Sequence, residues 1–285
     1  MNIRLRVGVP DDATVCGRIC YDAFGAISHA HGFPNDYPSV EAATGLVSSL
    51  LGHPGFYTVV AEADGSVVGS NFMDERAQIA GVGPVSVEPG MQDRGVGRLL
   101  MQDVLQRAAG RHVPGIRLLQ TTYHNRSLSL YAKLGFRVHE LVACMQGSPP
   151  KAAIPGYEVR AGTVADIATC DSLCVRVHGH DRHGEVVDSV TDGTCLVVER
   201  HGRLSGYSTG VGFSGHSVGE TNEDLKALIV AVPRFAGPGI LVPTANADLL
   251  GWCLSCGLRI VELLALMTIG LYNQPTGSYL PSILY

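Results

Sequence analysis

The sequence has no run of apolar residues that approaches the ~20 needed to cross a membrane, so a membrane-spanning helix is not expected. It also lacks a block of basic residues, and its 26 aspartates and glutamates outnumber its 21 lysines and arginines. The net charge of −5 argues against nucleic-acid binding as a main role. The first residues, MNIRLRVGVPDD, lack the apolar segment of a secretory signal, so we do not expect an exported protein.

Charged residues are scarce, at 16% of the chain, whereas hydrophobic residues make up 46%. This composition is typical of a globular protein with a substantial core and not of a disordered chain. The eight cysteines are scattered through 285 residues, and a chain of this size does not need disulfides for stability. We therefore expect reduced thiols and a cytoplasmic location.

A segment rich in proline and glycine divides the chain. Residues 146–156 read QGSPPKAAIPG, with three prolines and two glycines, which is typical of a linker. The segments on either side are each about the size of a domain. The sequence therefore predicts two domains, over residues 1–147 and 157–285.

The two predicted domains resemble each other at three places in the same order. RVGVPDD at residue 6 resembles RAGTVAD at residue 160, and TVVAEADGSVVGS at residue 58 resembles CLVVERHGRLSGY at residue 195. NRSLSLYAKLGFRV at residue 125 resembles NADLLGWCLSCGLRIV at residue 246. We interpret these matches as a duplicated domain that has diverged.

Hydrophobic periodicity and turn residues predict an α/β order of elements in the first domain. The expected strands cover residues 4–9, 57–62, 67–72, 82–87, 116–121, 136–139 and 141–146, and the expected helices cover residues 11–24, 40–51, 95–109 and 127–134. This order predicts a mixed sheet flanked by helices rather than a purely parallel sheet.

The stretch VSVEPGMQDRGVGRLLM, residues 85–101, places two glycines and a cation at the start of a predicted helix. A helix N-terminus carries unpaired N–H groups and about half a positive charge, so it binds phosphate readily. Gly95 and Gly97 let the backbone approach a ligand without a side chain in the way. The stretch is not a dinucleotide fingerprint, because Leu100 stands where that motif has its third glycine, and no P-loop sequence is present.

The pattern Gln92-x-x-Gly95-x-Gly97 resembles the pyrophosphate loop of the GNAT superfamily of N-acetyltransferases. Asn125 and Tyr131 in HNRSLSLYAKLGF, which ends in the Leu-Gly-Phe turn of that family, extend the resemblance over roughly residues 3–146. The resemblance implies two tandem GNAT-like domains, each with a mixed, mostly antiparallel sheet. It also implies acetyl-coenzyme A (acetyl-CoA) as co-substrate and transfer of the acetyl group to a primary amine, which we expect to belong to a small molecule.

The resemblance also implies roles for individual positions of the first domain. Backbone groups of Val85, Ser86 and Val87 would hold the pantetheine arm and stabilise the oxyanion, and Asn125 would bind the same arm. Tyr131 would protonate the leaving thiolate, because a tyrosine keeps its proton at neutral pH. The pyrophosphate would be held by Gln92, Asp93, Arg94, Gly95, Val96, Gly97 and Arg98.

The second domain lacks this loop. In its counterpart region, Glu220, Glu223 and Asp224 lie at a helix start and would repel a pyrophosphate. We therefore expect a degenerate second domain that has lost the cofactor site and that shapes the acceptor pocket or mediates assembly, for which a homodimer is one form.

The sequence does not assign the general base. The central strand reads Gly81-Val82-Gly83 where the family often carries a glutamate. Glu88 and His124 are alternatives, and a water relay or a neutral acceptor would need no base. A non-catalytic sensor or scaffold that binds CoA or acyl-CoA would fit this missing glutamate, and transfer of a longer acyl group is a further option.

Histidines follow the first helix of both domains. A polar loop is favoured over a metal site for both groups, so no metal is predicted. In the first domain this loop would border the acceptor, so we expect His29, His31 and Asp36 to be able to contact it. The second group consists of His178, His180 and His183.

Overall fold

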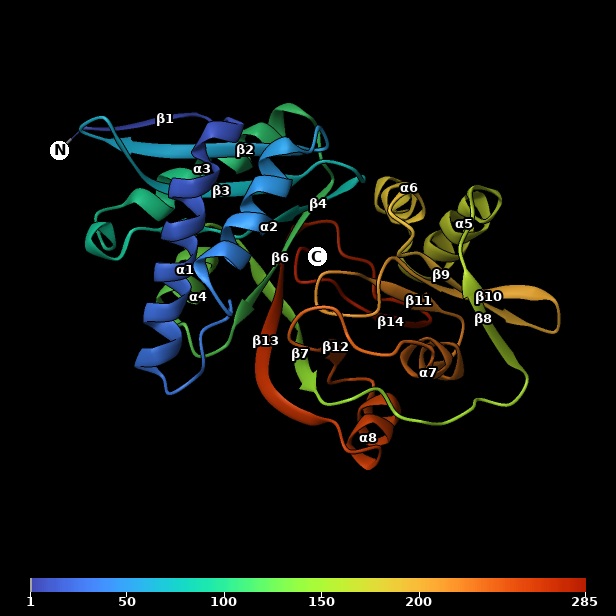
Figure 1. The fold of residues 1–285 in the computed structure, drawn as a ribbon. Coiled ribbons are helices and arrows are strands. Elements are labelled where there is room, and N and C mark those ends of the chain that lie inside the picture. The colour runs from blue at the N-terminus through green and yellow to red at the C-terminus, as the bar shows by residue number, and fades with distance from the viewer. Residues whose placement is uncertain (1) are drawn as a thin grey trace.

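A computed structural model describes residues 2–285, and Figure 1 shows the two halves of the chain next to each other. In the first half the strands are β1 (Ile3–Val7), β2 (Phe56–Ala63), β3 (Ser66–Asp74), β4 (Ile79–Val82), β5 (Ser86–Val87), β6 (Gly115–Thr121) and β7 (Arg137–Gln146). The helices of this half are α1 (Ala13–Ala30), α2 (Val40–Gly52), α3 (Val96–Gly110) and α4 (Asn125–Lys133).

The second half repeats this order in a shorter form. Its strands are β8 (Tyr157–Ala161), β9 (Leu196–Arg200), β10 (Arg203–Ser208), β11 (Ser217–Gly219), β12 (Ile240–Pro243), β13 (Arg259–Gly270) and β14 (Ser278–Leu280). Its helices are α5 (Ile167–His178), α6 (His183–Thr191), α7 (Asn222–Ala231) and α8 (Ala247–Ser255). The mixed α/β class predicted from the sequence is confirmed.

The element order predicted for the first half is confirmed except at two places. The strand expected over residues 82–87 is two short strands, β4 and β5, because Pro84 has no N–H with which to continue a ladder. The two strands expected over residues 136–139 and 141–146 are one strand, β7. A one-residue bulge at His139 bends this strand without ending it.

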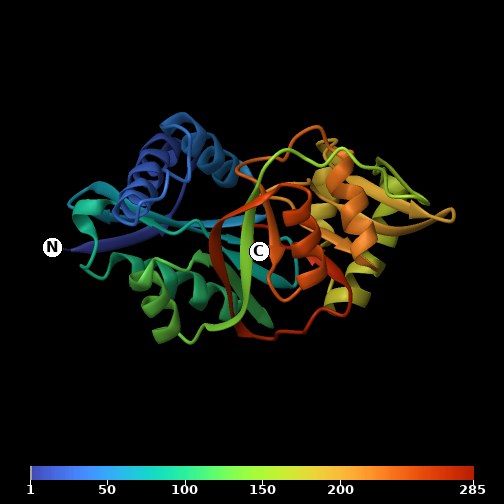
Figure 2. The same ribbon diagram turned by 90° about the horizontal axis from the view of Figure 1, so that it is seen from below.

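The two halves share one sheet because they exchange strands. The strand order of this sheet is β1-β2-β3-β4-β6-β13-β7-β12. β5 pairs with β3 as well and is not part of this linear order. β13 belongs to the second half, yet it lies between β6 and β7 and is antiparallel to both. β7 in turn pairs with β12 of the second half. Figure 2 shows β7 (light green) and β13 (red) next to each other at the centre of the molecule. The sheet therefore crosses the linker boundary seen in the sequence.

Within residues 2–285, strands β5 and β6 form no ladder with each other, and we call the place between them in the first half the wedge. β4 is parallel to β6 over residues 79–81, and within residues 2–285 β5 pairs only with β3. Glu88 N–H donates to Val68 O over 2.9 Å. Because backbone groups alternate in direction along an antiparallel strand, those of the preceding residue, Val87, point away from β3 and toward the wedge.

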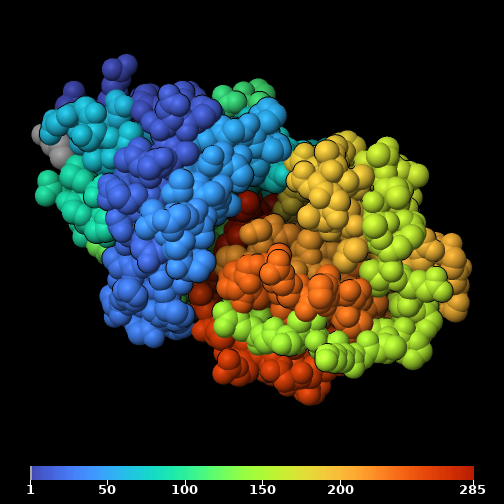
Figure 3. Space-filling model, in the orientation of Figure 1, coloured from blue at the N-terminus to red at the C-terminus, as the bar shows by residue number. Residues whose placement is uncertain are grey.

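Helices cover both faces of the first-half sheet. α3 and α4 pack on one face, where Val96, Leu100 and Tyr131 belong to one apolar cluster. α1 and α2 pack on the opposite face, against Val60 and Phe72. Figure 3 shows a hollow between the halves, with dark red atoms of the C-terminal segment at its floor.

Two expectations from composition can be compared with the structure. All eight cysteines are free thiols, as the sequence predicts. In the described part of the chain, no helix has both the length and the apolar character that crossing a bilayer requires.

Candidate active site

The N-terminus of α3 is open. Gly95 is its N-cap residue, with a φ of 86° that residues with a side chain rarely adopt, and within residues 2–285 no side chain caps the helix. The first N–H groups of the helix therefore have no intrahelical partner. Arg94 and Arg98 are exposed beside them and supply positive charge. This arrangement is suited to binding a phosphate group.

Gln92 and Asp93 are held by Arg126, a residue that sequence analysis did not single out. Arg126 Nη2 donates to Gln92 Oε1 over 2.6 Å, and its Nη1 donates to Asp93 Oδ2 over 2.8 Å. Gln92 Nε2 donates to Val87 O over 3.2 Å. These bonds tie the loop to α4 and to β5. The sequence signal for Arg126 is a cation in the first turn of a helix, where the helix dipole disfavours it.

Tyr131 lies inside the first half, close to the wedge. Its side chain packs in the same apolar cluster as Val85 and Val87, and its ring centroid is 6.0 Å from that of Phe136. Burial raises the pKa of Tyr131 to about 12, so the phenol is protonated at neutral pH. Tyr131 as a whole is buried, with 8% of its surface exposed. Asn125 is exposed at the first turn of α4, next to Arg126.

The matching place in the second half is closed by the chain itself. β11 pairs with β10 in the way that β5 pairs with β3, but the other edge of β11 is taken by β14. At the start of the following helix, α7, Asp224 Oδ2 accepts from Thr221 N and Thr221 Oγ1 over 2.8 and 2.9 Å. The helix start is therefore capped by a carboxylate, whereas the start of α3 is open.

An open pocket of about 330 Å³ lies at the end of β6. Tyr123 is central to it: its ring stacks on Phe33 at a centroid distance of 4.4 Å, and His31 lies at 5.2 Å. Tyr123 OH is 3.3 Å from Ser28 Oγ, which donates to Asp36 Oδ1 over 2.7 Å. The loop expected to border the acceptor therefore lies at this pocket. The lining residues are Phe33, Thr122, Tyr123, Ile260, Val261, Glu262 and Leu263.

Glu262 is a carboxyl group of this pocket that sequence analysis missed. It is on β13 and therefore comes from the second half. Its Oε1 atom is buried and, in the part of the chain that the structure describes, has no hydrogen-bond partner. Burial, and then the nearby Asp36 carboxylate, raise the pKa of Glu262 to about 8. Burial also raises the pKa of Asp36.

Glu88 and His124, the two candidate bases from the sequence, are less suited to accept a proton. Glu88 Oε2 accepts from Arg18 Nη2 of α1 over 3.2 Å, so its charge is already paired. Burial lowers the pKa of His124 to about 4, which makes it a weak base at neutral pH. The structure therefore favours neither of them over Glu262.

The histidines of the second half do not come together. His178 and His180 are buried where the halves meet, with ring centroids 5.8 Å apart, and His180 Nε2 is 2.9 Å from Tyr285 OH. His183 is on the surface, with Nδ1 2.6 Å from Asp171 Oδ2. Within residues 2–285, no group of three or more potential ligands is placed to hold a metal ion.

Comparisons with known proteins agree with this description. Residues 54–138 match the family model described as an acetyltransferase (GNAT) domain. The chain is similar to a Pyrococcus horikoshii protein classed among the acetyltransferases, with 18% identity, a TM-score of 0.74, and coverage of 97% of this chain and 94% of that chain.

Two further solved structures match over almost the whole chain. A GCN5-related N-acetyltransferase from Sphaerobacter thermophilus has 14% identity and a TM-score of 0.62, with coverage of 95% and 96%. A tandem GNAT protein from the clavulanic acid biosynthesis pathway has 15% identity and a TM-score of 0.59, with coverage of 94% and 98%. None of the curated proteins matches the sequence. At these identities the structural likeness establishes the fold.

Proposed function

We propose that this chain, which carries a GNAT acetyltransferase domain in its first half, transfers the acetyl group of acetyl-CoA to a primary amine of a small molecule. Two features of residues 2–285 carry the proposal. No side chain caps the N-terminus of α3, and the edge of β5 that faces away from β3 pairs with no other strand. A pyrophosphate suits the helix start. The extended, amide-containing pantetheine arm suits the strand edge, because its amides can pair with the strand as a peptide would.

The contacts follow from the direction of each group. Val87 and, two residues earlier, Val85 direct backbone groups toward the wedge, where an N–H would stabilise the oxyanion. The backbone groups of Ser86, between these two residues, are directed at β3, and its hydroxyl is 3.2 Å from Ser70 Oγ, so Ser86 is the one of the three predicted strand residues that we do not propose as a contact of the pantetheine arm. The pyrophosphate would meet the N–H groups of Val96 and Gly97, and the remaining contacts would come from Gln92, Asp93, Arg94, Gly95, Arg98 and Asn125.

Tyr131 would act as the general acid. Acetyl transfer expels a thiolate, and a phenol that stays protonated at neutral pH can donate a proton to it. The side chain of Tyr131 packs in one cluster with Val85 and Val87, the residues that would hold the pantetheine arm, so the phenol lies on the side of the strand where the thiolate would form.

One acetyl-CoA would bind per chain, because β14 and Asp224 occupy the matching places in the second half. The free thiols support a reducing compartment, the cytoplasm. The net charge of −5 suits a cationic acceptor. We also propose that the chain can associate into a homodimer, which sedimentation in an analytical ultracentrifuge tests.

Calorimetric titration with acetyl-CoA tests the cofactor site. We expect one site per chain. We also expect a Gly95→Val/Gly97→Val variant to bind at least about tenfold more weakly, because losing charge-assisted contacts costs ~1.5–3 kcal/mol. Gly110→Val is the matched control, because Gly110 ends the same helix in open space. No binding by the parent, or equal weakening by the control, would contradict the proposal.

Release of free thiol in the presence of an amine panel tests turnover. Tyr131→Phe should lower kcat about 10²-fold and leave the Kd for acetyl-CoA unchanged, because only proton donation is lost. Tight binding without thiol release for any amine would instead indicate a non-catalytic sensor or scaffold.

A further inference from the structure

We propose that Glu262, supplied by the second half of the chain, is the general base of the active site in the first half. This inference rests on the proposed acetyl transfer and deepens it. It gives the second half a chemical role that a diverged duplicate does not otherwise have.

The strand exchange brings Glu262 to the site. β13 is hydrogen-bonded along β6, and beyond the end of β6 the Thr122 N–H and Thr122 Oγ1 both donate to Leu263 O over 3.0 Å. These bonds fix β13 at the β6–α4 turn, which contains Tyr123 and leads into α4. Arg126 in the first turn of α4 donates to Gln92 of the pyrophosphate loop. Glu262 therefore lines a pocket at the turn that precedes the helix to which the pyrophosphate loop is tied.

At Gly81, one of the three central-strand positions where the resemblance suggests a base, the chain leaves no room for a side chain. A Cβ built on Gly81 would lie 2.0 Å from Leu284 O, so no longer residue fits at this position of β4 without a shift of backbone. The C-terminal segment covers that part of the strand. A carboxylate base in place of residue 81 would therefore come from another element, and β13 is the element inserted on the far side of β6.

Glu262 has the environment of a proton acceptor. Its Oε1 atom is buried and lacks a partner within residues 2–285, whereas the side chain as a whole is only partly buried and lines the pocket. The groups that face it are the Asp36 carboxyl and the Tyr123 phenol, together with the Cys144 thiol of the neighbouring strand β7. None of these is a cation that would hold Glu262 permanently ionised. A carboxyl group with a pKa near the working pH is effective in both taking up and releasing a proton.

The same surroundings indicate the class of acceptor. Two carboxyl groups and the stacked rings of Phe33 and Tyr123 suit an ammonium ion, which is attracted by carboxylates and by aromatic faces. The pocket therefore suits an acceptor with a protonated primary amine.

The proposed step balances as follows. The Glu262 carboxylate takes one proton from the ammonium group and becomes a carboxylic acid, which leaves the amine with a free electron pair. That pair forms a C–N bond to the thioester carbon, the C–S bond breaks, and the thiolate is protonated, in our proposal by Tyr131. The nitrogen of the resulting adduct loses a second proton, which restores the Tyr131 phenol. The products are an amide and free CoA, and the one proton held by Glu262 returns to solvent.

The test is the pH profile of acetylation by the full chain with the best amine of the panel. In the parent, kcat/KM should rise with pH and level off once Glu262 is ionised. Glu262→Gln should lower kcat about 10²–10³-fold and remove this rise, whereas Glu262→Asp should retain part of it. Glu158→Gln is the matched control, because Glu158 is exposed on β8 of the second half.

The outcomes separate the two proposals. A parent that acetylates amines, with a Glu262→Gln variant that matches Glu158→Gln in kcat and pH profile, overturns the role of Glu262 alone. A parent that binds no acetyl-CoA in calorimetry overturns the proposed function and this role with it. Loss of the pH-dependent rise with an unchanged Kd for acetyl-CoA supports the inference, because a merely structural defect would not remove one ionisation.

Discussion

Glu262 is buried in a way that suits a general base, but the same burial lowers the free energy of unfolding once the carboxyl group ionises. The pKa of this group in the folded chain, about 8, lies above its usual value of 4.5. At pH values between 4.5 and about 8, the Glu262 carboxyl group is ionised in the unfolded chain but still protonated in the folded chain. The free energy of unfolding therefore falls as pH rises from 4.5 through 8.

We predict that Glu262→Gln raises the Tm at pH 9 and changes it little at pH 5, because a buried amide does not ionise. The gain in unfolding free energy follows from 1.36 kcal/mol per pKa unit and should reach about 1–4 kcal/mol. Thermal unfolding followed by circular dichroism at both pH values measures it, with Glu158→Gln as the control. An equal change in Tm at pH 5 and pH 9 would show that the ionisation of Glu262 is not its cause.

The sequence revealed those site residues that have a local signature. Gly95 and Gly97 mark the start of α3 by their spacing, and Tyr131 follows from its motif. Arg126 and Glu262 could not be predicted because the residues they contact are distant in the sequence. Arg126 binds Asp93, 33 residues earlier, and Glu262 lies at the pocket only because β13 is inserted beside β6. The periodicity of a single segment holds no information about contacts with distant segments.

At the level of elements, the sequence predicts strands more reliably than it predicts their neighbours. The alternation of apolar residues in β13 places Ala265 and Met267 on one face and Leu264 and Leu266 on the other. This pattern would be the same whichever sheet the strand joined, so the exchange of β7 and β13 is not visible in it. The break between β4 and β5, in contrast, has a local cause in Pro84.

We predict that neither half folds alone. Residues 1–150 without β13 would expose the whole edge of β6, because all seven residues Gly115–Thr121 pair with that strand. The apolar side chains of β13 would also be missing from the first-half core. When tagged residues 1–150 are co-expressed with residues 151–285, the halves should co-purify and bind acetyl-CoA.

The matched control for this experiment is each half expressed separately, which should aggregate or lack a cooperative thermal transition. A separate first half that unfolds cooperatively and binds acetyl-CoA with the affinity of the full chain would show that β13 is dispensable.

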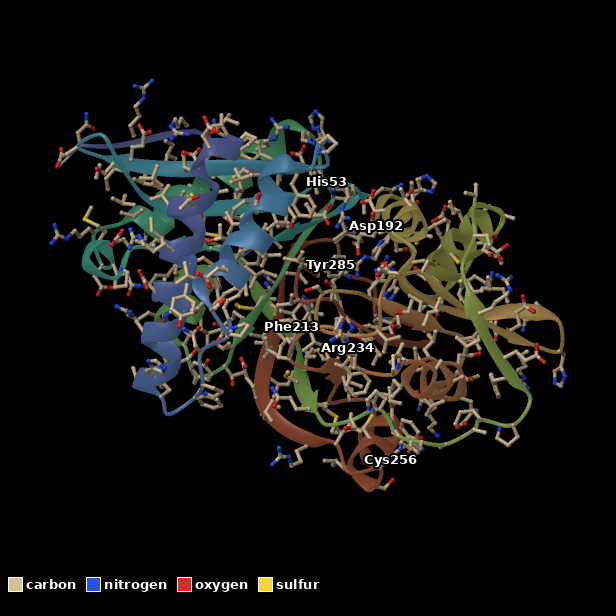
Figure 4. All side chains as sticks on the ribbon, viewed as in Figure 1. His53, Asp192, Phe213, Arg234, Cys256 and Tyr285 are labelled. Carbon is tan, nitrogen blue, oxygen red and sulfur yellow. The ribbon has the colours of Figure 1, made fainter. Side chains whose placement is uncertain are left out.

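Across the whole molecule, buried polar groups join the halves. Arg117 of β6 donates to Tyr285 OH, which also contacts His180. Arg76 Nη1, just after β3, donates to Asp188 Oδ2 of α6 in the second half over 2.7 Å. Figure 4 labels Tyr285 at the centre of the molecule, between the two halves. Burial lowers the pKa of both histidines at this junction, to about 4 for His180, so both are neutral at pH 7.

This junction makes the stability of the molecule sensitive to acid. As pH falls below 6.5, the unfolded chain binds a proton at position 180, whereas the folded chain does not bind it until about pH 4. The free energy of unfolding contributed by His180 is therefore intact above pH 6.5 and is lost as pH falls toward 4. At 1.36 kcal/mol per pKa unit the loss is about 3 kcal/mol.

We predict that His180→Gln costs about 1 kcal/mol at pH 7.5, where one hydrogen bond to Tyr285 is weakened, but makes the chain less sensitive to acid. Urea unfolding at pH 7.5 and pH 4.5 should show a smaller loss of unfolding free energy for the variant than for the parent, by about 2 kcal/mol. His29→Gln is the control, because His29 is exposed. Equal losses for parent and His180→Gln would mean that His180 does not contribute to the acid sensitivity of the junction.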